Sequence, residues 1–145
     1  MNDISLITTS ILGGCGLLIT FIYNYHSRKL DKDRMNKELF SEFNKRYDVL
    51  NDYLYQITTT CKTLEDLNKQ PLLKYKLNDY YNLCAEEYYW FNKNRIDEKV
   101  WDSWEAGMNC WYSDFEIIKL GWKQELKENG HKSFYLKKNE QFFKD

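Results

Sequence analysis

Glu86 and Glu87 are the side chains in this sequence whose type and spacing best fit acid–base catalysis or ligand binding. Glu87 continues the seven-residue series of Leu73 and Tyr80, so we predict that it faces the core of a helical domain. A buried carboxylate must be paired or protonated. Glu87 is therefore either a catalytic or ligand-binding acid, or a structural acid that accepts hydrogen bonds from tyrosines or pairs with Arg95. We favour the structural interpretation.

Other catalytic arrangements are missing from the sequence. His26 and His131 lie apart from any G-x-S-x-G motif. There is no Walker loop, no G-x-G-x-x-G and no H-E-x-x-H. Two histidines cannot form a three-histidine zinc site, and the cysteines lack zinc-type pairing. We predict that the protein is not an enzyme, and that it has no metal and no cofactor.

Basic residues in the second half of the chain are the candidates for binding an anionic ligand. With 21 basic and 22 acidic residues the formal charge is −1, which argues against a strongly basic nucleic-acid binder. Most lysines on a protein surface bind no ligand. The candidates for a nucleotide or oligonucleotide ligand are Lys93, Arg95, Lys132, Lys137 and Lys138.

Four cysteines, Cys15, Cys61, Cys84 and Cys110, are well separated on predicted helices. In a cytosolic domain we expect them to be reduced and to act as small, buried, apolar residues.

The N-terminal region carries no charged residue between Ile4 and Tyr25. As a helix this stretch is about 33 Å long, enough to cross a hydrocarbon core of about 30 Å. Basic residues follow it from Arg28 to Arg34. The positive-inside rule then predicts a single-pass bacterial inner-membrane protein with its N-terminus outside and its large domain in the cytoplasm.

Two other interpretations of this region are weaker. A cleavable signal peptide needs a basic segment at its start, whereas Asp3 is the only charged side chain there. A lipoprotein signal is suggested by Leu12-Gly13-Gly14-Cys15, but the residues after Cys15 stay apolar where a mature lipoprotein would become polar.

One face of the predicted membrane helix consists of small and hydroxylated residues, which are Ser5, Thr9, Gly13, Gly16 and Thr20. They fall within an arc of about 80°. Such a stripe lets helix backbones approach closely in lipid and predicts a homo-oligomer. The associated helices could enclose a narrow wettable lumen or form a dry bundle.

Apolar residues then recur every seven positions in two series offset by three. The series are Phe40, Tyr47, Leu54 and Cys61, and Phe43, Leu50, Ile57 and Leu64. This pattern predicts a long helix over about 30–68, which ends before Pro71. It is either a coiled-coil stalk between subunits or the longest helix of an intramolecular bundle, and its bulky aromatic residues favour the bundle.

Three further helices are predicted, the first over about 72–91. Asp97 is the expected N-cap of the second, on which Trp101, Trp104, Met108 and Trp111 share a face. An S-x-x-E capping box at Ser113–Glu116 is expected to begin the third, which ends near Gly130.

The predicted fold is thus all-α: one N-terminal transmembrane helix, a long helix and a small aromatic-rich helical bundle. We divide the chain into an anchor with its juxtamembrane segment over 1–29, a cytosolic domain over 30–130 and an unassigned tail over 131–145. Aromatic residues make up 17% of the chain. They either fill the core or leave a partly open pocket that stacks a planar ligand.

Several segments resemble an uncharacterised family of small bacterial proteins, each with a single membrane helix and a helical domain. The most specific are Asn82-Leu83-Cys84-Ala85-Glu86-Glu87-Tyr88 and the Val100-Trp101-x-Ser103-Trp104 pattern. The segment from Phe40 to Asp48 and the spacing to Trp122 and Glu125 also match. Some members are linked to phage defence, which implies an effector that permeabilises the inner membrane. The resemblance implies no catalytic residues.

These observations favour a homo-oligomeric inner-membrane effector in anti-phage defence that forms a channel and senses an anionic, nucleotide-like ligand. Its partners would be the lipid bilayer and further copies of itself. The alternative is a membrane-tethered adaptor that binds a partner protein through its helical domain. An enzyme using Glu86 or Glu87 is the third and weakest possibility.

Overall fold

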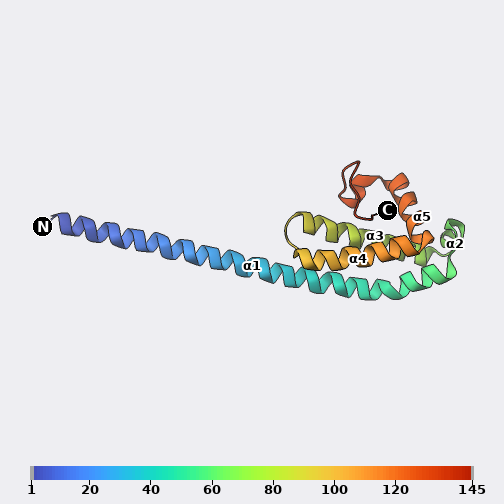
Figure 1. Cartoon of the computed structure of the whole chain (residues 1–145), viewed down its shortest axis with the longest axis horizontal. Coiled ribbons are helices and arrows are strands. Elements are labelled where there is room, and N and C mark those ends of the chain that lie inside the picture. Colours follow the sequence, from blue (N-terminus) through green and yellow to red (C-terminus); the bar gives the residue numbers. More distant parts are fainter. Residues whose placement is uncertain (1, 145) are drawn as a thin grey trace. The chain divides into compact units, whose positions relative to one another are not determined.

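A computed structural model describes the backbone of residues 2–144 and the side chains of residues 16–144. The chain is 83% helical and, over these residues, contains no strand, so the all-α prediction is confirmed. The elements are α1 (Asn2–Thr60), α2 (Leu64–Asn68), α3 (Pro71–Asn92), α4 (Glu98–Asp114), α5 (Glu116–Asn129) and a 3₁₀ helix, η1 (His131–Phe134) (Figure 1).

The chain divides into two compact units between Lys37 and Glu38. In the first unit, the Thr20 hydroxyl donates a hydrogen bond to the Gly16 carbonyl, 2.8 Å away. The other predicted stripe residues, Ser5, Thr9 and Gly13, lie outside the described side chains. Of the helices that the described residues form, none is long and apolar enough to cross a membrane, so the structure does not support the predicted transmembrane helix.

The second unit, here called the helical domain, spans Glu38 to the end of the described chain. Its α3 and α4 form a hairpin in which the Phe91 and Trp101 rings stack at a centroid distance of 4.7 Å. Asp97 caps α4 as predicted, because its carboxylate accepts a hydrogen bond from the Lys99 N–H. The α1 residues Phe43, Leu50, Leu54 and Ile57, and Cys61 directly after the helix, are buried in the same core, as the bundle interpretation requires.

The predicted end of the long helix near residue 68 was wrong, because α1 ends at Thr60. The hydroxyls of Thr59 and Thr60 bond back to carbonyls of the preceding turn. Thr63 then begins the separate helix α2 through a capping box with Asp66. The apolar residues keep their seven-residue spacing across this break, so the sequence pattern does not indicate where α1 ends.

The predicted capping box at Ser113 was also wrong. Ser113 still belongs to α4, and α5 begins at Glu116 after a single extended residue, Phe115, with no side-chain cap. Phe115 packs on the Trp111 ring at a centroid distance of 5.2 Å. This contact, rather than a serine hydroxyl, accompanies the turn between the two helices. Gly130 ends α5 at φ 75°, as predicted.

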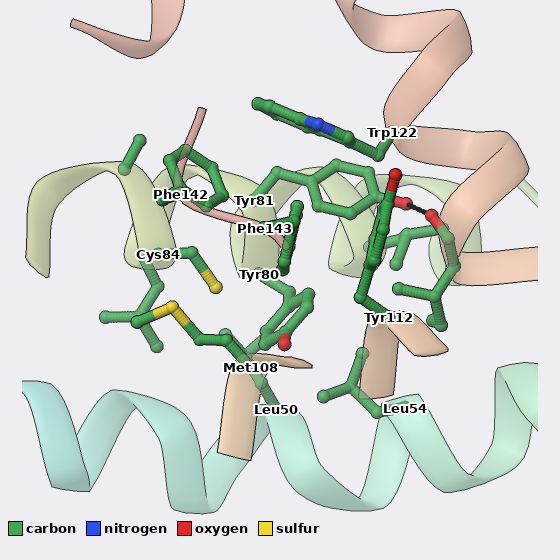
Figure 2. Close-up of a cluster of buried hydrophobic side chains, with 14 of the residues drawn as sticks. Leu50, Leu54, Tyr80, Tyr81, Cys84, Met108, Tyr112, Trp122, Phe142 and Phe143 are labelled. Carbon is green, nitrogen blue, oxygen red and sulfur yellow. Dashed lines mark hydrogen bonds between the residues drawn. The ribbon is translucent and has the colours of Figure 1, made fainter. Parts of the chain in front are cut away.

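The core of the helical domain is a cluster of aromatic rings (Figure 2). Trp122 of α5 is 1% exposed, and its ring lies within 5.5 Å of the rings of Tyr81, Phe134, Phe142 and Phe143. Three of these rings come from the segment after Gly130, for which the sequence predicts no structure. That segment is therefore an integral part of the core.

Gly121 of α5 sits where there is no room for a side chain. A Cβ there would lie 2.5 Å from the Tyr81 hydroxyl oxygen and 3.0 Å from the Leu77 Cδ2. The Tyr81 hydroxyl is fixed because it donates a 2.6 Å hydrogen bond to the Ile118 carbonyl (Figure 2). Close packing of α3 against α5 therefore depends on a glycine at this position.

Gly121→Ala is expected to lower the free energy of unfolding by about 1–2 kcal/mol, because so close a contact costs about 2–3 kcal/mol of overpacking against a helix-propensity gain of about 1 kcal/mol. All five tryptophans lie in the helical domain, so their fluorescence during urea unfolding measures this. Gly107→Ala is the matched control: it faces open space in α4 and should raise stability. A Gly121→Ala protein as stable as the wild type would contradict the close contact.

Candidate functional site

A cavity of about 190 Å³ lies between α1, α3 and α4 in the helical domain. Most of its wall is apolar or aromatic, with a few polar groups among them. Its lining residues are Asn44, Tyr47, Tyr80, Leu83, Cys84, Glu87, Ser103, Trp104, Gly107 and Met108. A mostly apolar hollow with few convergent polar groups is the usual form of a small-molecule site.

Two indole groups of α4 hold the wall that α1 contributes. The Trp104 Nε1–H donates to the Asn44 Oδ1 at 3.2 Å, and the Trp111 Nε1–H donates to the Tyr47 hydroxyl at 2.9 Å. The Trp104 ring also packs edge-on against Phe43, at a centroid distance of 5.7 Å. The predicted tryptophan face of α4 thus serves to position α1 beside the cavity.

Glu87 is buried in the cavity wall, with 5% of its surface exposed, as its place in the apolar series predicted. Among the described residues, no hydrogen bond or ion pair joins its carboxyl to another group. Burial raises the pKa of Glu87 to about 8, while Arg46 opposes this shift and Glu86 adds to it. Glu87 is therefore mainly a neutral acid at pH 7.

Glu86, by contrast, is paired. Its carboxylate accepts two hydrogen bonds from the Arg46 guanidinium of α1, at 2.6 and 3.1 Å. This bond raises the pKa of Arg46. The structural interpretation predicts a bond to Glu87 from a tyrosine hydroxyl or from Arg95, and neither is found in the described chain. The Arg46 partner of Glu86 lies forty positions away in the sequence, too far for a local sequence pattern to indicate it.

Tyr80 contributes a second buried polar group, its hydroxyl, to the wall of the cavity. Its hydroxyl oxygen is fully buried and has no oxygen or nitrogen partner within the described chain, but it interacts with the Cys84 thiol, a weak hydrogen-bonding group. Burial raises the pKa of Tyr80 well above its usual value, and Cys84 adds to the shift. Burial also raises the pKa of the Cys84 thiol well above its usual value. Both groups therefore stay protonated.

The cysteine prediction holds for two of the four residues. Cys61 and Cys84 are free and buried, whereas Cys110 is exposed, because it lies on the outer face of α4 and contacts Asp114. The side chain of Cys15 lies outside the described residues.

None of the five predicted basic ligands lines the cavity, and all five side chains are exposed: Lys93, Arg95, Lys132, Lys137 and Lys138. The Lys93 ammonium lies 5.4 Å from the Tyr89 ring centroid, and that ring lies 5.2 Å from the Tyr135 ring. Lys93 is thereby brought towards the segment that carries Lys132 and Lys137. Within the described chain, no side-chain contact brings Arg95 or Lys138 towards Tyr89 and Tyr135.

Comparisons of the chain with protein-family models, curated proteins and solved structures gave no match. The resemblance to a family of small membrane proteins therefore stays a prediction. Of the described residues, no group of three or more His, Cys, Asp or Glu side chains is placed to hold a metal ion.

The sequence pattern indicates Glu87 as a candidate site residue, but it does not indicate that most of the other lining residues form a cavity. Tyr47 and Tyr80 had been assigned to apolar core series, although a tyrosine at such a position brings a hydroxyl that needs a partner. Asn44 and Ser103 gave no signal at all, because polar residues on helices are common. The cavity arises where three helices meet, and no single helical pattern contains it.

Proposed function

We propose that the chain is a homo-oligomeric inner-membrane effector whose helical domain senses a small ligand. The observation that carries the sensing role is the cavity, whose wall contains the buried Glu87 carboxyl without a hydrogen bond from any described residue. Buried polar groups are nearly always hydrogen-bonded, and leaving one unsatisfied costs about 1–3 kcal/mol. A bound molecule that hydrogen-bonds to the Glu87 carboxyl would offset this cost.

Binding fits this cavity better than catalysis does. A general base or nucleophile works best when its pKa lies near or below the working pH. Burial raises the pKa of both Tyr80 and Cys84 well above their usual values, so neither is an active nucleophile. The pKa of Glu87, about 8, would suit a general acid, but the lining residues include no histidine and no activated nucleophile to act with it.

The membrane part of the proposal is supported by the sequence. Ile4–Tyr25 carries no charge, and basic residues follow it, which favours an anchor with its N-terminus outside. The stripe of small residues favours self-association. The channel-forming role in phage defence is supported by the family resemblance alone. A nucleotide-like anion would need a second site near Lys93, since the cavity has no basic lining residue.

Replacing Gly13 and Gly16 together by leucine is expected to convert the full-length oligomer in detergent to a monomer and to abolish conductance in planar bilayers. Leucine side chains would keep the helix backbones apart. Light scattering gives the mass. Leu18→Ala, on the opposite face of the predicted helix, is the control and should leave both properties intact. An unchanged oligomer in the glycine double variant would refute association through the stripe.

The adaptor role is the second candidate, and exposed apolar side chains on the helical domain favour it. Val49 and Tyr55 of α1 are 58% and 68% exposed, and Leu72 and Tyr75 of α3 are 59% and 62% exposed. Exposed apolar residues of this size can form a protein-binding surface when they are contiguous. An adaptor would keep its function when residues 1–29 are replaced by an unrelated membrane helix, whereas the proposed effector would lose it.

A further inference from the structure

We propose that the cavity between α1, α3 and α4 binds a small organic cation, whose ammonium or amidinium group pairs with Glu87 and whose apolar part lies against Trp104. The proposal rests on the sensing role proposed for the helical domain and names the ligand class. It does not depend on the membrane anchor or on the oligomer.

The charges around the cavity favour a cation. Glu87 is the only acid among the lining residues, and none of them is Lys, Arg or His. Arg46, the nearest guanidinium in the ion-pair network, is held in two hydrogen bonds by Glu86. An anion in the cavity would therefore lie beside the Glu87 carboxyl with no free basic side chain to pair with. A cation would instead form an ion pair with the Glu87 carboxylate.

The size and lining of the cavity set the shape of the ligand. A cavity of about 150 Å³ lined by apolar side chains accommodates benzene. The 190 Å³ found here has room for one six-membered ring that carries a short charged substituent. Trp104, Met108 and Leu83 supply the apolar wall against which the ring of the ligand would lie.

Binding must release a proton. In the empty cavity Glu87 is mainly neutral, so a cation that pairs with its carboxylate displaces the carboxyl proton to solvent. The groups that face Glu87 are Arg46 and Tyr47 from α1 and Tyr80, Cys84 and Glu86 from α3. The α4 lining residues include no titratable group. Affinity for the cation should therefore increase with pH. The increase should stop at pH values at which Glu87 is already ionised in the empty cavity.

Isothermal titration of the full-length protein in detergent with benzylammonium tests the proposal. This probe stays cationic over the pH range used. Its affinity should rise about twentyfold between pH 6 and pH 7.5, because Glu87 ionises with a pKa of about 8. Titrations in buffers of different ionisation enthalpy should show release of nearly one proton per ligand at pH 6.

Matched ligands and variants isolate the charge. Benzyl alcohol, which has the same ring and no charge, should bind at least tenfold more weakly at pH 7.5, and benzoate should not bind. Glu87→Gln keeps the shape of the side chain but should lower benzylammonium affinity at least tenfold and remove its pH dependence. Glu98→Gln, in the exposed first turn of α4, should change neither.

Three outcomes would overturn the proposal: no binding of benzylammonium, equal binding of benzyl alcohol, or unchanged binding by Glu87→Gln. If Glu87→Gln does not fold, Glu87→Asp replaces it; this variant must weaken binding and keep the proton release. Loss of conductance in the glycine double variant is measured separately. A failed cation site with intact conductance, or the reverse, therefore shows which of the two proposals is wrong.

Discussion

The free energy of unfolding of the helical domain is expected to fall by about 3–4 kcal/mol between pH 5 and pH 8 because of Glu87 alone. The folded pKa of this acid, about 8, lies above its ordinary value of 4.5. In that window the folded protein holds a proton that the unfolded chain has lost. Raising the pH therefore favours the unfolded chain, which is the opposite of the usual effect of carboxylates.

Glu87→Gln provides the comparison, because glutamine has the same shape and does not ionise. The stability of this variant relative to the wild type should increase by about 3–4 kcal/mol from pH 5 to pH 8. Tryptophan fluorescence during urea unfolding at several pH values measures this difference. Asp66 and Glu140, whose pKa values are lowered in the fold, affect stability only at more acidic pH. A constant difference between the two proteins would mean that Glu87 is ionised at pH 7.

Trp122→Ala is expected to remove about 3–5 kcal/mol of stability, which is the usual cost of truncating a large buried aromatic residue. The ring is 1% exposed and touches rings from α3 and from the segment after Gly130, so its loss leaves a cavity bounded by several elements. Small domains are stable by only about 5–15 kcal/mol, so most of that margin would be lost.

The remaining four tryptophans still report unfolding of the Trp122→Ala protein in urea. Trp122→Phe should recover part of the stability, because a smaller ring still fills some of the space. Leu72→Ala, at an exposed position of α3, should change the free energy of unfolding by less than about 0.5 kcal/mol. A Trp122→Ala protein within 1 kcal/mol of the wild type would show that the rings around it close the gap.

Helical periodicity predicted much of the fold because each pattern lies within one element. The predicted helix over 72–91 differs by one residue at each end from α3, and Asp97 caps α4 as expected. The errors occurred where tertiary contacts set a boundary. Phe115 packs against Trp111 and begins α5 two residues after the serine that the capping pattern had indicated.

The candidate site was harder to predict, because its parts come from different helices. The burial of Glu87 follows from its position in α3, but the Arg46–Glu86 ion pair and the bond from Trp111 to Tyr47 join residues far apart in sequence. The segment after Gly130 has no helical or alternating pattern, so nothing local indicates that Phe142 and Phe143 are buried. Only the packed rings of α3 and α5 explain that burial.

The burial of Phe142 and Phe143 also sets the order in which the helical domain assembles. The α3–α4 hairpin closes over a short turn, so its Phe91–Trp101 stack costs little loop entropy and can form early. Phe143 instead packs on Tyr80 and Tyr81, more than sixty residues earlier in the chain, and its contacts with Trp122 need α5 already in place. We infer that these two rings dock after the folding transition state. Contacts that form after the transition state chiefly slow unfolding. Phe142 and Phe143 therefore lengthen the lifetime of the folded domain and have little effect on its folding rate.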